Sequence, residues 1–233
     1  QMPVSEVKCI YNGTKLEMDK KQSLQEIVAL RDRLRQELEL PLTSRLVLTV
    51  GRLNQQKGYS DPIPIIPAIA KEFPEVKFIW VGDGELRSQL QAEVKATKIE
   101  ASVLFLGYRN DIPQLLKAAD LFLFPSHYEG YPFALLEAMA YGLPIVASNA
   151  NPMPEIITDR LEGLLFRKGD RHDLLAKLRW ALQNPLLMRG MAENAKLRVR
   201  GFSTTKMSFE TLDLVWQLMS RNEDIEKQKQ TVL

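Results

Sequence analysis

Six short apolar segments, each followed by a stretch of helical pattern, run through the middle of the chain. They lie at residues 46–50, 76–81, 103–106, 121–124, 144–147 and 164–166. Each is a nearly continuous apolar run, as expected for strands of a parallel sheet with helices on both faces. The pattern predicts an α/β fold, in which a doubly wound parallel sheet of about six strands carries a ligand crevice at the carboxyl ends of its strands.

The composition excludes several classes of protein. The chain has 233 residues, of which 45% are apolar and 26% are charged, and its net charge is +2. This balance is typical of a globular protein with an ample core, and the charge is too small to indicate a nucleic-acid partner. The single cysteine, Cys9, excludes an internal disulfide framework and fits a reducing, cytoplasmic setting. No apolar run approaches the ~20 residues of a membrane span, and we expect no signal peptide.

Residues 125–148 place two carboxylates around the predicted start of a helix. Glu129 lies in a loop that contains glycine and proline, and Glu137 lies in the apolar helical segment that follows. Because proline is tolerated in a first helical turn, we expect the helix to begin near Phe133. The two carboxylates then flank the amino terminus of this helix.

This arrangement predicts a binding site for a nucleotide sugar. Unpaired backbone N–H groups and the positive end of a helix dipole bind anions such as phosphate. A carboxylate on each side of a bound diphosphate can accept one hydrogen bond from a sugar hydroxyl and one from a ribose hydroxyl. The competing interpretation makes Glu129 and Glu137 ordinary surface carboxylates. The apolar residues around Glu137 argue against it, since a half-buried carboxylate needs a partner.

A second loop follows the first predicted strand, where a phosphate-binding loop belongs in this topology. Gly51 and Gly58 allow tight turns, and Arg52 and Lys57 between them can reach a diphosphate. Such cations are more often solvated surface residues, but here they share a sheet edge with the two carboxylates. We therefore expect Arg52 and Lys57 to bind the diphosphate.

The segment from Glu129 to Glu137 resembles the Glu-x7-Glu motif of the retaining glycosyltransferases of group 1, also called family 4, which have the GT-B fold. The loop from Gly51 to Gly58 is similar to the Gly-Arg-Leu…Lys-Gly motif of the same family. The resemblance implies that residues 42–200 form a Rossmann-like, nucleotide-sugar-binding domain, the carboxyl-terminal half of a GT-B fold. The amino-terminal, acceptor-binding half is then absent from this chain, and we expect the isolated chain to be inactive or weakly active.

The resemblance also implies roles for the site residues. Glu129 would hold donor sugar hydroxyls and would act in catalysis together with Arg52 and Lys57, whereas Glu137 would hold the ribose. The donor-binding set would be Gly51, Arg52, Lys57, Tyr108, Arg109, Glu129, Gly130, Phe133, Ala134, Leu135 and Glu137.

Two parts of this set have more specific roles. The backbone of residues 130–135 would bind the distal phosphate. Tyr108 and Arg109, just after the third strand, would flank the base by stacking, and the alternative for these two is a plain surface loop.

Neither a metal site nor a cofactor is expected. His127 lies near Glu129 and is tempting as a catalytic base, but the resemblance assigns it no role. Neither histidine has a companion at metal-ligand spacing, and the sequence contains no Asp-x-Asp triplet. We expect a metal-independent reaction whose donor is a UDP-, GDP- or ADP-sugar.

Three local features can be checked against the structure. Ser23 and Glu26 form a capping box that starts a helix, so residues 1–41 are predicted as a linker and a connecting helix. Three prolines in residues 62–67 predict that the helix after the second loop starts late. Asp83 is predicted as a turn and helix-capping residue.

The carboxyl-terminal segments resemble the end of the family's chains. Residues 201–220 resemble the final helix, which crosses back to the amino-terminal half, and residues 221–233 are expected to form a polar tail.

The sequence therefore predicts a hexosyltransferase domain that acts on a glycan or lipid-linked acceptor once it is joined to its amino-terminal half. A lipid-linked acceptor would bring it to the inner face of the cytoplasmic membrane. The alternative is a stand-alone nucleotide-sugar-binding module without activity of its own. A GT-B epimerase or a phosphorylase fits less well, because no lysine-anchored cofactor motif is present.

Overall fold

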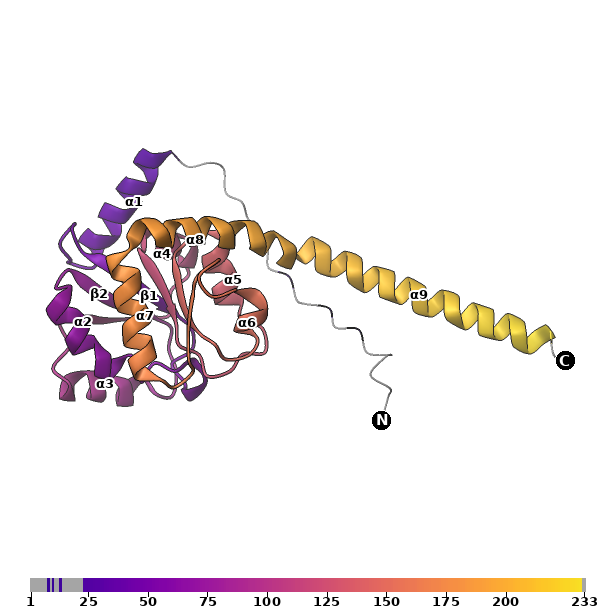
Figure 1. The fold of residues 1–233 in the computed structure, drawn as a ribbon, viewed down its shortest axis with the longest axis horizontal. Helices are drawn as coiled ribbons and strands as arrows, with labels where there is room; N and C mark the ends of the chain where they lie inside the picture. The colour runs from indigo at the N-terminus through magenta and orange to yellow at the C-terminus, as the bar shows by residue number, and fades with distance from the viewer. Residues whose placement is uncertain (1–7, 9, 11–12, 14–22, 232–233) are drawn as a thin grey trace. The chain divides into compact units, whose positions relative to one another are not determined.

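The computed structural model describes residues 8, 10, 13 and 23–231 (Figure 1). The chain divides into two units, one of residues 18–199 and one of residues 1–17 with 200–233. The first unit contains the whole sheet and also begins earlier than the predicted domain boundary at residue 42, because helix α1 (Leu24–Glu37) packs on helix α4 (Ile112–Ala118).

The described strands of the first unit form one six-stranded parallel sheet. The strands are β1 (Arg45–Val50), β2 (Val76–Val81), β3 (Val103–Gly107), β4 (Leu121–Phe124), β5 (Ile145–Ser148) and β6 (Leu164–Phe166). Their order across the sheet is β3-β2-β1-β4-β5-β6. The predicted fold class, a doubly wound Rossmann-like sheet, is confirmed.

The strand order reverses between β1 and β4, which are neighbours with Val47 opposite Leu121. Chain order leads outward from β1 through β2 to β3, and then outward from β4 through β5 to β6. In sheets of this kind a ligand crevice lies outside the carboxyl ends of the strands at the reversal. The loops after β1 and β4 therefore border the predicted crevice.

Helices follow the strands as predicted. Besides α1 and α4, the first unit contains α2 (Ile66–Glu72), α3 (Arg87–Ala96), α5 (Phe133–Ala140), α6 (Met153–Ile156), α7 (Arg171–Gln183) and α8 (Pro185–Arg198), with 3₁₀ turns η2 (Gln55–Lys57) and η3 (Ile63–Ile65). The capping box at the start of α1 is confirmed, with the Ser23 side chain accepting from Glu26 N–H. The late start after the second loop is also confirmed: α2 begins only at Ile66, and Pro67 occupies its first turn.

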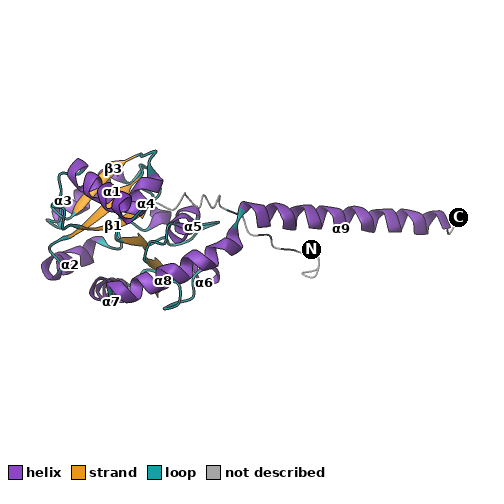
Figure 2. Ribbon diagram, turned by 90° about the horizontal axis from the view of Figure 1, so that it is seen from above, coloured by secondary structure: helices purple, strands orange, loops and turns teal. Residues whose placement is uncertain are grey.

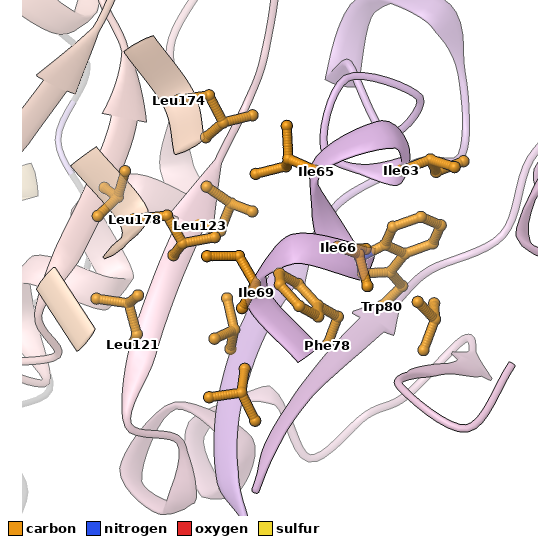
Figure 3. Packing of buried hydrophobic residues seen from close by; sticks show 14 of the residues in the cluster. Ile63, Ile65, Ile66, Ile69, Phe78, Trp80, Leu121, Leu123, Leu174 and Leu178 are labelled. Atoms are coloured by element: carbon orange, nitrogen blue, oxygen red, sulfur yellow. The ribbon is translucent and has the colours of Figure 1, made fainter. Parts of the chain in front are cut away.

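One face of the sheet packs against η3, α2 and α7. Figure 3 shows Ile69 next to Phe78 of β2, Ile66 next to Trp80 of the same strand, and Ile65 directed to the side of Leu123 of β4. In Figure 2, α2 and α7 lie on one side of β1, and α1 and α4 lie on the other. Both faces are thus covered, which explains why the strands are apolar on both sides rather than alternating.

A polar cluster closes the amino-terminal edge of the sheet. Asp120 accepts hydrogen bonds from Leu46 N–H of β1 (2.8 Å) and from the Arg35 guanidinium of α1 (2.8 Å), and it also pairs with Arg31. The Arg35 side chain is only 2% exposed, and burial lowers the pKa of this guanidinium. This cluster fixes α1 to the start of β1.

The second unit contains helix α9 (Thr204–Thr231). It begins close to the predicted crossover helix but continues to Thr231, across residues for which we expected a polar tail. Its apolar side chains Phe209 and Trp216 are 73% and 71% exposed. None of the helices in the described part of the chain combines the length and apolar character needed to cross a membrane.

Candidate functional site

The loops after β1 and β4 meet at the carboxyl edge of the sheet, as the strand order requires. Lys57 Nζ of the first loop lies 2.7 Å from Glu129 Oε1 of the second. The Glu129 side chain is 4% exposed and the Lys57 side chain is 19% exposed. Two of the predicted site residues therefore form a largely desolvated ion pair between adjacent strand ends.

Glu129 has further partners that fix its loop. Gln56 Nε2 donates to Tyr128 O (3.0 Å) and lies 3.4 Å from Glu129 Oε2. The Glu129 N–H donates to Asn151 O in the loop after β5. Both carboxylate oxygens therefore contact the Lys57 loop, and the backbone of Glu129 is tied to the loop after β5.

Glycine permits the close approach of the two loops. Gly58 has φ +65°, and a Cβ atom on it would lie 2.1 Å from Pro125 O. Just before it, the Asn54 side chain accepts from Lys57 N–H and caps η2. The backbone thus turns sharply after Lys57 and passes directly against the β4 loop.

The Lys57 side chain runs over Gly51 and the end of β4. A Cβ atom on Gly51 would lie 3.2 Å from Lys57 Cδ and Cε, and Lys57 Nζ lies 5.4 Å from the centre of the Phe124 ring. Beneath this loop, the buried Tyr59 hydroxyl donates to Gly51 O (3.0 Å). Burial raises the pKa of the Tyr59 hydroxyl, so it remains a hydrogen-bond donor.

Arg52 lies on the same loop but is not joined to the Lys57–Glu129 pair. Its guanidinium pairs with Glu85, 3.1 Å away in the loop after β2, and its side chain is 69% exposed. Ion pairs this exposed are weak, so a ligand can recruit this cation at little cost.

Helix α5 begins at Phe133, where the sequence predicted it, with Pro132 as the N-cap residue. The N–H groups of Phe133 and Leu135 donate to Tyr131 O and Pro132 O, respectively. By contrast, the N–H groups of Gly130 and Ala134 donate to no other residue that the structure describes. Only part of the predicted phosphate-binding backbone therefore has unused donors, and these lie directly after Glu129 and in the first turn of α5.

Glu137 lies one turn further along α5 and is half-buried. Burial raises the pKa of its carboxyl above the ordinary value. Within the described part of the chain, this carboxylate has no hydrogen-bond or ion-pair partner. A ligand that brings hydroxyl donors would supply the missing partner.

The residues predicted to flank a base follow β3. Tyr108 is 79% exposed, so its ring faces are accessible. Arg109 is bonded to Asp111 (2.7 Å) and to Glu37 of α1 (2.6 Å), and these hydrogen bonds raise the pKa of its guanidinium. The Arg109 guanidinium is therefore hydrogen-bonded to two carboxylates of the protein.

The structure also places Asp83 and His127, two further residues considered in the sequence analysis. Asp83 accepts from Gly84 N–H (2.8 Å) and from Arg87 (2.9 Å), which confirms a turn residue, but Leu86 is the N-cap residue of α3. The helix begins later than expected because Gly84 and the two residues after it continue the turn. His127 is bonded to Asp61, and no group of metal-ligating side chains occurs among the residues described.

Sequence reasoning missed Gln56, Asp61 and Glu85, which hold Glu129, His127 and Arg52. Gln56 could have been suspected because it adjoins Lys57. Nothing in the spacing of Asp61 or Glu85 indicates their contacts.

A hollow of about 700 Å³ lies at the opposite edge of the sheet, between α1, α4 and α8. Two of the cations that line it, Arg31 and Arg45, are bonded to Asp120 and to Leu182 O, and Lys117 and Arg189 line it as well. The carboxyl edge is the better candidate site, because its unused donors and its unpartnered carboxylate lie at the point where the strand order reverses.

In doubly wound sheets, the strand ends and the amino terminus of a helix are where phosphorylated ligands commonly bind, and the lysine–carboxylate pair lies at such a place. Comparison with known proteins identifies the family. The family model for "Glycosyl transferases group 1" matches residues 31–198, and the chain belongs to this family.

Curated relatives match over most of the chain. It is 33% identical over 186 residues to the Escherichia coli UDP-Gal:alpha-D-GlcNAc-diphosphoundecaprenol alpha-1,3-galactosyltransferase, covering 76% of this chain and 46% of the relative. It is 27% identical over 212 residues to a Campylobacter jejuni diphospho-undecaprenol 4-alpha-N-acetylgalactosaminyltransferase, covering 90% of this chain and 54% of the relative. The chain thus spans about half the length of the curated relatives that it matches.

Solved structures agree with the GT-B assignment. Anabaena HepE in complex with UDP-glucose superposes with a TM-score of 0.77 at 26% identity, covering 90% of this chain and 57% of HepE. HepE has also been solved with UDP and with UDP and glucose, at TM-scores of 0.79 and 0.77. The sheet described here is one half of a GT-B fold.

Proposed function

We propose that the chain binds a nucleoside-diphosphate sugar at the carboxyl edge of its sheet and acts as the donor-binding half of a retaining, family 4 glycosyltransferase. The observation that carries this proposal is the Lys57–Glu129 pair, 2.7 Å apart beside the amino terminus of α5. It places a cation for phosphate and an acceptor for hydroxyls at one point of the crevice.

Each part of the donor has a matching group. The diphosphate would bind Lys57, Arg52 and the unused N–H groups of Gly130 and Ala134. Glu129 would accept from donor sugar hydroxyls, and Glu137 would accept from the ribose. The lack of a described partner for the half-buried Glu137 carboxylate supports this division, because ribose hydroxyls would complete its hydrogen bonding.

The base would lie against the loop after β3. Tyr108 is exposed and can stack on a base, and backbone groups of this loop would complete the contact. Arg109 would contribute less by stacking than by holding the loop to α1 through Glu37.

Catalysis would depend mainly on electrostatics at the leaving group. As the bond from the sugar to the diphosphate breaks, negative charge grows on the diphosphate, and Lys57 and Arg52 would stabilise it. They would supply the positive charge that other enzymes take from a divalent ion, so we propose a metal-independent reaction. No cofactor is needed, since the donor carries its own leaving group. Departure and attack on the same face of the sugar would give retention of configuration.

The acceptor is proposed from the relatives. The Escherichia coli and Campylobacter jejuni enzymes are named for diphosphoundecaprenol-linked acceptors. We propose a glycan or lipid-linked acceptor, held largely by the amino-terminal half of a GT-B fold, at the cytoplasmic face of a membrane.

A binding module without activity is the second candidate. The observation that favours it is that the contacts described at this edge, such as the Lys57–Glu129 pair, account for donor binding without any acceptor contact. Both candidates predict donor binding, but only the first predicts that sugar transfer appears when an amino-terminal half is supplied.

Calorimetry and thermal unfolding with UDP, GDP, ADP and their glucose or mannose derivatives test the proposal. We expect weak binding of one nucleotide series, stronger for the sugar-bearing ligand than for the bare diphosphate. Absence of heat and of stabilisation at millimolar concentration for all of these ligands would contradict the assignment of the site. Efficient sugar transfer by the 233-residue chain alone would contradict the need for another half.

A further inference from the structure

His127 makes two polar contacts and one packing contact with the loop that carries Lys57. Its backbone N–H donates to Gln56 O (2.7 Å), and its ring Nε2 lies 2.9 Å from Asp61 Oδ2. Its Cδ2 would lie 3.2 Å from a Cβ atom on Gly58, so the ring packs against that turn. The histidine is thus held by the Lys57 loop from both its backbone and its ring.

Asp61 is well placed to act as the anchor. Its side chain is 13% exposed, and its N–H donates to Gly58 O (3.0 Å), which ties it to the turn after Lys57. Among the described residues, His127 is the one hydrogen-bond partner of its carboxylate. Because a carboxylate only accepts hydrogen bonds, Nε2 must carry the proton in this contact.

This contact acts on Glu129 through a short path. Glu129 follows His127 by two residues, and Gln56, whose carbonyl accepts the His127 N–H, also donates through its side chain to Tyr128 O (3.0 Å). A displaced His127 would therefore carry the backbone of Glu129 away from Lys57. Because Asp61 engages the ring and Gln56 O accepts the backbone N–H, these contacts assign His127 a role in positioning this loop.

We propose that Asp61 and His127 form a positioning pair that holds the Glu129 loop in register with the Lys57 loop, and that this pair sets the preference of the site for a sugar-bearing nucleotide over the bare diphosphate. The second half of this statement rests on the proposed function, in which Glu129 meets the donor sugar. The first half rests on the contacts alone and is tested separately.

The first test measures the loop without any ligand. The chain has two histidines, so a His172→Gln variant assigns the imidazole ¹⁵N signals. We expect His127 to carry its proton on Nε2 and its backbone N–H to exchange slowly with solvent. Asp61→Ala should change the His127 imidazole signals and speed the exchange of the His127 and Glu129 N–H groups at least threefold, about the effect of losing one weak hydrogen bond. Unchanged signals and exchange would overturn the positioning pair.

The second test measures affinity for UDP and UDP-glucose in the 233-residue chain. Asp61→Ala and His127→Ala should each weaken UDP-glucose binding by about 3- to 10-fold, the effect of one hydrogen bond, and leave UDP within about twofold. His127→Gln should bind UDP-glucose more tightly than His127→Ala and nearly as tightly as the parent chain, because the glutamine Nε2 can donate to Asp61. His172→Gln is the matched control, since this exposed histidine lies at the start of α7 and its N–H bonds to Asp170.

The outcomes separate the two claims. Equal losses of UDP and UDP-glucose, or no loss of either, would overturn the role in sugar preference. If the parent chain binds neither ligand, the proposed function and the sugar preference both fail, and the exchange measurement still decides whether the pair positions the loop. Should Asp61→Ala unfold the domain, Asp61→Leu, which keeps the branched shape of the side chain but cannot accept a hydrogen bond, takes its place in both tests.

Discussion

Lys57 Nζ and Glu129 Oε1 lie 2.7 Å apart, although 72 residues separate them in the chain. In this arrangement, the cation proposed for phosphate neutralises the carboxylate proposed for the sugar. An ammonium group has three donors, so Lys57 can keep this contact and still reach a phosphate oxygen. Donor binding would then extend an existing polar network rather than replace it.

Removal of Lys57 should therefore affect both binding and stability. Lys57→Met should weaken diphosphate binding by about 1–3 kcal/mol, the usual loss for a charge-assisted hydrogen bond. It should also lower the free energy of unfolding, because the 4% exposed Glu129 side chain loses its counter-charge. Adding Glu129→Gln to Lys57→Met should recover part of that stability in a double-mutant cycle followed by urea unfolding. Strictly additive effects of the two substitutions would show that the pair is not coupled.

Substitution of Arg52 should weaken binding, whereas substitution of its partner Glu85 should not. Arg52→Ala should weaken binding of the nucleoside diphosphate by about 1–3 kcal/mol and leave stability nearly unchanged, since the side chain is exposed. Glu85→Ala should keep or strengthen binding, because it releases Arg52 from its ion pair. The measurement is calorimetry at low and high salt, with smaller differences expected at high salt. Equal losses in both variants would mean that the loop shape, not the Arg52 charge, matters.

The sequence predicted most of this edge at the level of backbone. The strand pattern and the position of Gly130 and Pro132 were sufficient to place the start of α5 at Phe133 and to bring two loops to one edge. The sequence alone did not predict which side chains pair, because the pairing depends on distances between segments that are remote in sequence. Arg109 illustrates this: its bond to Glu37 exists only because α1 docks on α4, and no local pattern specifies that docking.

The two glutamates should be separable by ligand. Glu137→Gln should weaken UDP and UDP-glucose alike, since both carry the ribose. Glu129→Gln should leave UDP nearly unchanged and weaken UDP-glucose by about 1–3 kcal/mol, because only the latter carries the sugar hydroxyls. Calorimetry of both variants with both ligands gives the comparison. Equal losses of UDP and UDP-glucose in Glu129→Gln would contradict its assignment to the sugar.

Glu137 should also make stability depend on pH. Burial raises the pKa of its carboxyl in the folded state, so the folded protein holds more protons than the unfolded chain between the ordinary and the raised pKa values. The contribution of the Glu137 carboxyl to the free energy of unfolding is therefore most favourable below the ordinary carboxyl pKa. It decreases as the pH rises from the ordinary to the raised pKa. The Gln side chain of Glu137→Gln does not titrate, so the free energy of unfolding of this variant should not decrease with pH in this way. Denaturant unfolding at a series of pH values checks it, and parallel curves for parent and variant would contradict it.

Two glycines of the site should respond differently to alanine. Gly58→Ala places a Cβ atom 2.1 Å from Pro125 O at φ +65° and should cost at least about 1–3 kcal/mol of stability, the range for a strained backbone. Gly130→Ala meets no atom within 4 Å and should change stability by less than about 0.5 kcal/mol. Thermal unfolding of both variants tests this pair, and comparable losses would show that the two loops are not packed as described.

The strand order has a consequence for synthesis. Translation proceeds from the amino terminus, so β1, β2 and β3 emerge from the ribosome before β4 exists. Until β4 emerges, the apolar strand that will become the middle of the sheet is an open edge, with backbone groups that another chain could pair. Because the crevice lies between β1 and β4, the edge of β1 that borders it stays unpaired in the nascent chain until β4 has been synthesised.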